Sequence, residues 1–147
     1  MQFTYEASAT IPMGPQAVLD HWSQADTLPR HLTHVRAIAG GDTDDVARLV
    51  IVLDGRHVEF VVQRTMCSET AVCWQNLGER LIYVLTVEAE PLDSVPSETR
   101  LKLTVSYDPP GFLPDIMESL GRNKSFRTAL ENDVKCYRDH FFVVASV

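Results

Sequence analysis

The sequence has little cysteine and a shortage of basic residues. Its three cysteines, Cys67, Cys73 and Cys136, form no CxxC pair. An odd number of cysteines, in a chain that starts without a basic or apolar leader, predicts reduced thiols and a cytoplasmic location. Lysine and arginine number 13 against 20 aspartate and glutamate residues, so the net charge is −7 at pH 7. This balance argues against nucleic acid and anionic membranes as partners, because both attract clustered positive charge.

Several motifs that indicate common chemistries are also missing. No run approaches the roughly 18 apolar residues of a membrane-spanning helix. The sequence has no GxGxxG loop for phosphate groups and no GxSxG nucleophile turn. His31 and His34 form an HxxH, but neither an HExxH nor a cysteine partner completes the three or four ligands that zinc needs. We therefore expect two surface histidines, no metal site and no organic cofactor.

What is present is the composition of one globular domain spanning residues 1–147. Apolar residues make up 45% of the chain and charged residues 22%, which is typical of such a domain. Residues 3–11 alternate between apolar and polar, which predicts a half-buried strand. A short helix is expected from Pro15 to Trp22, and residues 23–30 form a loop or a second short helix.

Six further segments have the pattern of strands. Residues 98–107 alternate cleanly, with Leu101, Leu103, Val105 and Tyr107 on one face. Clean alternation indicates an antiparallel sheet with one dry and one wet face. Asp54-Gly55 predicts a hairpin turn. The other expected strands cover residues 33–39, 46–53, 57–66, 70–76 and 80–90.

A long helix is expected from about residue 113 to residue 142. Its apolar stripe is interrupted at Asn123 and Arg127, either because the helix bulges into solvent there or because that part faces a cavity. Strands followed by one long helix predict an α+β fold. A curved sheet cannot match a straight helix along its whole length, so we expect a ligand pocket between them.

This order of elements resembles the START-like superfamily, also called SRPBCC, helix-grip or Bet v 1-like, and within it the polyketide cyclase/dehydrase and lipid-transport group. The resemblance implies a curved antiparallel sheet of six or seven strands wrapped round a long C-terminal helix, with two short helices after the first strand. It covers nearly the whole chain and is carried by Ala9-Thr10-Ile11-Pro12, residues 17–22, Leu28-Pro29, Val35, Ile38, Asp54-Gly55, Cys73-Trp74, Thr99, Leu101, Leu103 and residues 107–111.

The superfamily has no universal catalytic residues, so candidates come from the faces expected to point inward. Arg64 and Tyr107 are the catalytic candidates, because ring closure of a poly-β-ketone needs donors for the developing enolate oxygen. For Arg64 a strand-end position reaching solvent is the alternative, and for Tyr107 plain packing. No inward acid is evident as a base. The ligand-binding candidates are Trp74, Tyr83, Leu103, Met117, Asn123 and Arg127.

Three functions follow from this resemblance. The first is a cofactor-free polyketide cyclase, aromatase or dehydratase of secondary metabolism, acting on a polyketide intermediate. The second is a non-catalytic carrier or sensor of a lipid-like ligand. The third is a co-chaperone-like interaction module, which a large exposed apolar patch over a filled interior would favour. The apolar end at residues 143–147 is expected to pack on the sheet or on a partner, which includes a second copy in a homodimer.

Overall fold

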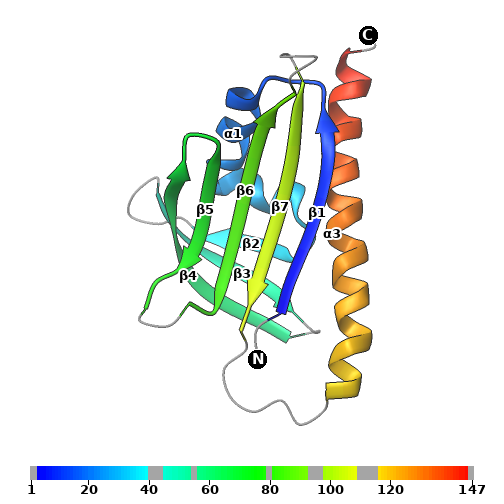
Figure 1. Ribbon diagram of the computed structural model, residues 1–147. Helices are drawn as coiled ribbons and strands as arrows, with labels where there is room; N and C mark the ends of the chain where they lie inside the picture. Colours follow the sequence, from blue (N-terminus) through cyan, green and yellow to red (C-terminus); the bar gives the residue numbers. More distant parts are fainter. Residues whose placement is uncertain are drawn as a thin grey trace.

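A seven-stranded antiparallel sheet forms the body of the protein in the computed structural model (Figure 1). The structure describes residues 3–39, 45–53, 56–78, 81–92, 98–108 and 116–145. The strands are β1 (Phe3–Ile11), β2 (Val35–Ala39), β3 (Val46–Leu53), β4 (Arg56–Ser68), β5 (Ala71–Asn76), β6 (Tyr83–Pro91) and β7 (Thr99–Tyr107). Their order across the sheet is β1-β7-β6-β5-β4-β3-β2, so each strand after β2 pairs with the one before it.

The alternation in the sequence decides which face of the sheet is buried. In β7, Leu101, Leu103 and Val105 are fully buried, whereas Arg100 is exposed. Strand β1 pairs with β7 over its whole length, from Phe3 opposite Tyr107 to Ile11 opposite Thr99. This register places the apolar side chains of neighbouring strands on the same concave face.

Three short helical segments connect β1 to β2. Helix α1 (Pro15–Trp22) begins with Pro15 in its first turn and buries Val18, Leu19 and Trp22. A single 3-10 turn, η1 (Ala25–Thr27), leads into α2 (Leu28–His31). Helix α1 packs on β6 and β7, so it covers one end of the concave face.

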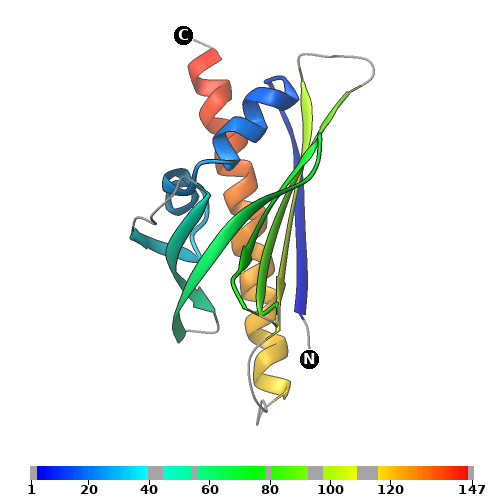
Figure 2. The same cartoon turned by 90° about the vertical axis from the view of Figure 1, so that its left-hand side faces the viewer.

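The long helix α3 (Ile116–Ala145) lies along β1 and runs through the inside of the curled sheet. Figure 2 shows it between β2 and β3 on one side and β1 and β7 on the other. Among its side chains that the structure describes, residues 126–140, the buried ones are Leu130, Asp133, Val134 and Tyr137. Phe126 precedes them at the same helical spacing and packs against the core. Within the described residues, no helix is long and apolar enough to cross a membrane.

The predicted architecture is confirmed, and two predicted strands, 3–11 and 46–53, have the observed bounds. Strands β2 and β6 start later than predicted, and α3 continues to Ala145. The predicted hairpin turn at Asp54-Gly55 and the predicted helix start at residue 113 lie outside the described residues. Residues 23–30 form short helical segments, the second of the two expected options.

Two expectations about individual residues are wrong. His31 and His34 are not surface residues: His31 is half-buried because its ring packs against Tyr137, and His34 is buried between Tyr83 and Phe126. Cys73 is disulfide-bonded, whereas Cys136 is free and exposed. A count of cysteines cannot show which of them the fold brings within bonding distance.

Candidate functional site

One end of the concave face is closed by α1 and is solid core. Trp22 and Trp74 are both fully buried there. The indole Nε1 of Trp74 donates a hydrogen bond to the carbonyl oxygen of Trp22 at 2.9 Å, so the sheet is tied directly to the end of α1. Trp74 therefore holds α1 on the sheet.

Arg64 also contacts the end of α1. Its Nη1 donates to the carbonyl oxygen of Ser23, the residue that caps the C-terminus of the helix, at 2.6 Å. The last carbonyls of a helix have no partner within it and carry partial negative charge, so a guanidinium there is favourable. This contact gives Arg64 a structural task at the rim of the concave face.

The other end of the concave face is lined by rings, four of which carry a polar atom. Ring contacts connect Tyr5 to Phe126 (centroids 4.6 Å apart), Phe126 to His34 (5.1 Å), His34 to Tyr83 (5.8 Å) and Tyr83 to Phe60 (5.9 Å). Tyr107 lies opposite Tyr83 in the sheet register. We call these six residues the aromatic cluster: Tyr5, His34, Phe60, Tyr83, Tyr107 and Phe126.

The cluster joins three parts of the fold that are distant in sequence. His34 comes from the approach to β2, Tyr83 begins β6 and Phe126 belongs to α3. The curl of the sheet brings β2 and β3 to face β6 and β7, and α3 lies between these two parts of the sheet (Figure 2).

At the centre of the cluster, Nε2 of His34 and the hydroxyl of Tyr83 are hydrogen-bonded at 2.7 Å. Burial lowers the pKa of His34 to about 3, because a charged imidazole would lose its hydration there. Burial also raises the pKa of the Tyr83 phenol well above its ordinary value. Both groups are therefore neutral over the whole physiological pH range.

Asn76 fixes the position of Tyr83. Its side-chain oxygen Oδ1 accepts hydrogen bonds from the backbone N–H groups of Ile82 at 2.7 Å and Tyr83 at 3.0 Å. Asn76 ends β5, and Gly78 in the following connection has a φ of 135°, which few side chains other than glycine tolerate. The turn chemistry between β5 and β6 thus determines where the phenol sits.

The cluster is suited to hydrogen-bonding a neutral polar group in apolar surroundings. A neutral imidazole offers one donor and one acceptor, and a phenol can do both. The described residues contain no group of three histidine, cysteine, aspartate or glutamate side chains arranged to hold a metal ion. The chemistry available in the cluster is therefore hydrogen bonding by the side chains themselves.

The structure brings only some of the predicted site residues together. Tyr83 and Tyr107 are in the cluster, and Leu103 is buried on the same concave face. Trp74 and Arg64 lie at the α1 end. Arg127 is exposed. The side chains of Met117 and Asn123 lie outside the part of the chain that the structure describes.

Sequence reasoning missed the other members of the cluster. Phe126 could have been found from helical spacing, because Phe126, Leu130, Val134 and Tyr137 follow one another at steps of four, four and three. Arg127 is exposed although Val134, seven residues further on and at nearly the same helical angle, is buried, so the period of 3.6 residues per turn alone could not distinguish the two positions. His34 had no such signal, because its side chain direction depends on the curl of the sheet.

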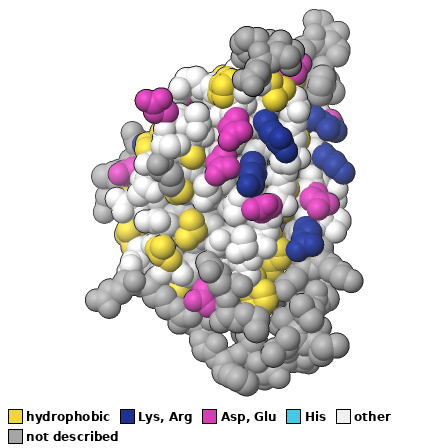
Figure 3. Space-filling model, viewed as in Figure 1, with side chains coloured by type: hydrophobic (Ala, Val, Ile, Leu, Met, Phe, Trp, Pro, Cys, Tyr) yellow, Lys and Arg dark blue, Asp and Glu magenta, His cyan; other side chains and the backbone are white. Residues whose placement is uncertain are grey.

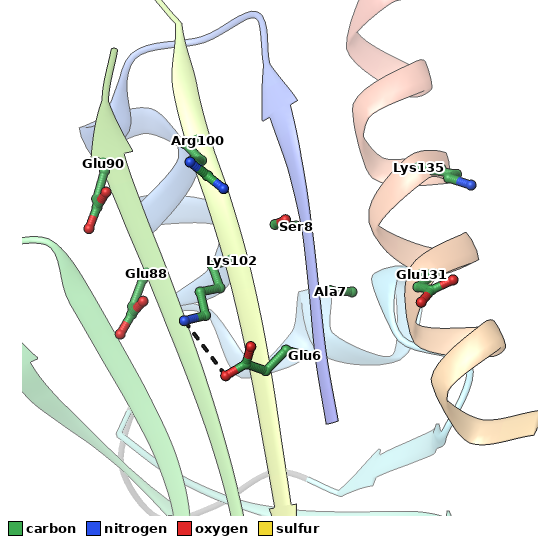
Figure 4. A pocket seen from close by; sticks show the side chains of 9 residues that line it. All are labelled: Glu6, Ala7, Ser8, Glu88, Glu90, Arg100, Lys102, Glu131 and Lys135. Atoms are coloured by element: carbon green, nitrogen blue, oxygen red, sulfur yellow. Dashed lines mark ion pairs between the residues drawn. The ribbon is translucent and has the colours of Figure 1, made fainter. Parts of the chain in front are cut away.

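A charged groove of about 590 Å³ lies on the opposite, convex side of the sheet and reaches α3 (Figure 3). Figure 4 shows side chains of both signs projecting from β1, β6, β7 and α3 into it. Lys102 Nζ and Glu6 Oε1 lie 3.6 Å apart in an exposed ion pair. Mixed charges and open solvent make this groove unsuitable for an apolar ligand. Its lining residues are Glu6, Ala7, Ser8, Glu88, Glu90, Arg100, Lys102, Glu131 and Lys135.

Comparison with solved structures places this architecture among known folds. A Deinococcus radiodurans protein, DR_A0006, is 15% identical and superimposes with a TM-score of 0.70 over 93% of this chain and 95% of its own. A START superfamily protein from Mycobacterium smegmatis is 14% identical, with a TM-score of 0.61 over 91% and 98%. The Zhui aromatase/cyclase from a Streptomyces strain is 12% identical, with a TM-score of 0.64 over 95% and 90%.

The chain therefore has the helix-grip fold of the START-like superfamily. No protein-family model matches the sequence, and no curated protein matches it significantly. At such low identity the superpositions establish the fold and leave the chemistry to be argued from the side chains.

Proposed function

We propose that this protein binds a hydrophobic small molecule at the aromatic cluster, between the concave face of the sheet and α3. The observation that supports this most directly is the His34–Tyr83 hydrogen bond, a buried polar pair surrounded by rings. Apolar sites with a few fixed polar groups are the usual form of small-molecule sites. Of the six cluster residues, Phe126 is the one that is only half-buried, so a ligand would enter beside it.

The surroundings favour a flat, neutral ligand that carries a hydroxyl or keto group. Rings at 4.6 to 5.9 Å from one another offer faces and edges to an aromatic or polyene body. A charged ligand group would lose its hydration without a compensating charge. Tyr83 and His34 can each exchange a hydrogen bond with a ligand oxygen, which would fix the ligand's orientation.

Reversible binding, as in a carrier or sensor, is the activity that this geometry supports best. Aldol closure of a poly-β-ketone removes a methylene proton, joins that carbon to a carbonyl carbon and then expels water. Removing the proton needs a base whose pKa lies near the working pH. An imidazole with a pKa of about 3 is a weak base, so His34 is better suited to recognition.

A polyketide cyclase is the second candidate, because the hydroxyl of Tyr83 is free to donate to a ligand in the tautomer in which Nε2 of His34 carries the proton. A neutral phenol in an apolar site can donate to an enolate oxygen as charge develops on it. Incubation with a linear poly-β-ketone thioester, followed by mass spectrometry for loss of water, tests this activity. Cyclised product formed faster than without protein, and formed at the uncatalysed rate with Tyr83→Phe, would support catalysis over simple binding.

The binding proposal is tested with 1-naphthol and naphthalene, which differ by one hydroxyl. We expect the wild-type protein to bind 1-naphthol about tenfold more tightly or better, since one well-formed buried hydrogen bond contributes about 1–1.5 kcal/mol. Tyr83→Phe should remove most of that preference while leaving the affinity for naphthalene within about twofold. Fluorescence titration at pH 7 measures all four dissociation constants.

The control is His57→Gln, which alters an exposed histidine on β4. It should keep the full preference for 1-naphthol. The proposal fails if neither compound binds, or if Tyr83→Phe keeps the same preference as the wild-type protein.

A further inference from the structure

A second pocket, of about 630 Å³, opens between the α1–α2 segment and α3. It shares no residue with the aromatic cluster or with the charged groove. Seven of the side chains that line it can ionise or carry charge: His21, Arg30, His31, Asp133, Cys136, Tyr137 and His140. Pro29, Leu32 and the ring of Tyr137 add apolar lining.

Two histidines of this pocket, His21 and His31, are held in place. Nδ1 of His21 and the hydroxyl of Tyr137 lie 3.1 Å apart, within hydrogen-bond distance. The ring of His31 packs edge-on against Tyr137, with centroids 4.9 Å apart, and against Trp22 at 5.2 Å. Because these side chains are already ordered, less side-chain entropy is lost when a ligand binds.

Basic side chains surround His31. Burial is the main reason that the pKa of His31 falls to about 4, and His21, His140 and Arg30 lower it further by repulsion. Asp133 is the acidic residue of the lining. Its Oδ2 already accepts hydrogen bonds from the backbone N–H of Thr33 at 3.0 Å and from the Thr33 hydroxyl at 3.1 Å. That carboxylate is thus engaged in holding α3 to the approach to β2.

We propose that this pocket binds a small organic carboxylate, with its charged end toward Arg30, His31, His21 and His140 and its apolar body against Pro29, Leu32 and Tyr137. An anion there would replace the mutual repulsion of these groups with attraction. His31 would then take up a proton on binding. The affinity should consequently rise as the pH falls. Asp133 acts in the same direction, because burial raises its pKa and its protonation removes a negative charge that would repel the ligand.

Benzoate is the probe, and benzamide is its uncharged control of nearly the same shape. Benzoate stays ionised between pH 7.5 and 5.5, so a change in its affinity over that range reflects protonation of groups in the protein. We expect isothermal titration to show at least about a threefold lower Kd at pH 5.5 than at pH 7.5, the size expected when one group gains a proton on binding. Benzamide should bind more weakly at both pH values, without pH dependence.

Two pairs of variants assign the effect to the pocket. Arg30→Gln should weaken benzoate binding about tenfold, and His31→Gln should reduce its pH dependence. The matched controls are Arg36→Gln and His57→Gln, which alter exposed residues outside the pocket and should leave both properties unchanged.

Histidine NMR signals of the wild-type protein provide a readout that needs no variant. Benzoate should shift the imidazole signals of His21, His31 and His140 while that of His57 stays in place. The proposal is overturned if benzoate binds no more tightly than benzamide, if its affinity is independent of pH, or if the shifted signals belong to histidines outside the pocket.

Discussion

At the scale of single residues, the His34–Tyr83 pair is unusual for the depth at which it lies. Tyr83 is fully buried and His34 is 7% exposed. A buried imidazole and a buried phenol that satisfy each other avoid the cost of leaving either polar group without a partner. The same burial keeps both groups neutral at all physiological pH values.

This burial predicts a pH-dependent contribution to stability. The pKa of His34 is about 3 in the folded protein and about 6.5 when unfolded. Between these values the unfolded chain binds a proton that the folded protein does not, so stability is full above pH 6.5 and falls as the pH drops. The stability advantage of the wild-type protein over His34→Gln should therefore shrink by about 1–2 kcal/mol from pH 7 to pH 5.

Urea unfolding of both proteins at the two pH values measures this change. His57→Gln is the control, and its stability should fall in parallel with that of the wild-type protein. An advantage over His34→Gln that stays constant with pH would show that His34 is not kept neutral by burial.

At the scale of elements, α1 depends on the sheet for its C-terminal end. Its last carbonyl groups accept hydrogen bonds from three side chains outside the helix: Thr27 to His21, Trp74 to Trp22 and Arg64 to Ser23. A helix of eight residues is too short to be stable alone, so these contacts and its buried face hold it. The hydrogen bond to Ser23 also explains why a charged residue, Arg64, can stand on the apolar side of β4.

Arg64→Ala should accordingly lower the free energy of unfolding by about 1–2 kcal/mol, the size of a partly buried hydrogen bond from a charged donor. The Kd for 1-naphthol should change by less than about twofold, because Arg64 lies at the α1 end. Arg48→Ala is the matched control. It removes an exposed ion pair with Glu59, 3.2 Å long, and should cost less than about 1 kcal/mol.

Chemical unfolding and the naphthol titration distinguish the two roles of Arg64. If Arg64→Ala leaves the stability unchanged but weakens 1-naphthol binding tenfold, Arg64 belongs to the ligand site after all.

At the scale of the whole molecule, the fold separates three surfaces of different chemistry. The concave face is apolar with a neutral polar pair, the convex face carries mixed charge, and the pocket beside α1 and α2 is rich in histidine. A co-chaperone-like function would need a large exposed apolar patch. Among the described residues, the large apolar side chains that are at least a third exposed are Val61, Met66, Leu77 and Leu81, and Figure 3 shows apolar side chains interspersed with charged ones.

Two separate sites predict additive stabilisation by their ligands. A ligand at 100 times its Kd stabilises the folded state by about 2.7 kcal/mol, which raises Tm by roughly 5–10 °C in a domain of this size. 1-Naphthol and benzoate together should therefore raise Tm by about the sum of their separate shifts. Thermal unfolding followed by circular dichroism measures this, and a combined shift no larger than the greater single shift would mean that both compounds compete for one site.

The sequence by itself determined the architecture. Alternation in residues 3–11 and 98–107 and the Pro15 helix start are local signals, and each follows from backbone geometry over a few residues. They were sufficient to predict a curled antiparallel sheet, short helices and a long C-terminal helix, and to place Leu103 and Tyr107 on the inner face.

Only the tertiary structure decided which side chains meet. His34 contacts Tyr83 across 49 positions of sequence, and Arg64 contacts Ser23 across 41. The local pattern of apolar and polar residues predicts whether a side chain faces the core. The curl of the sheet and the path of α3 set its partners, because contacts between distant segments depend on the summed twist and register of all the strands between them.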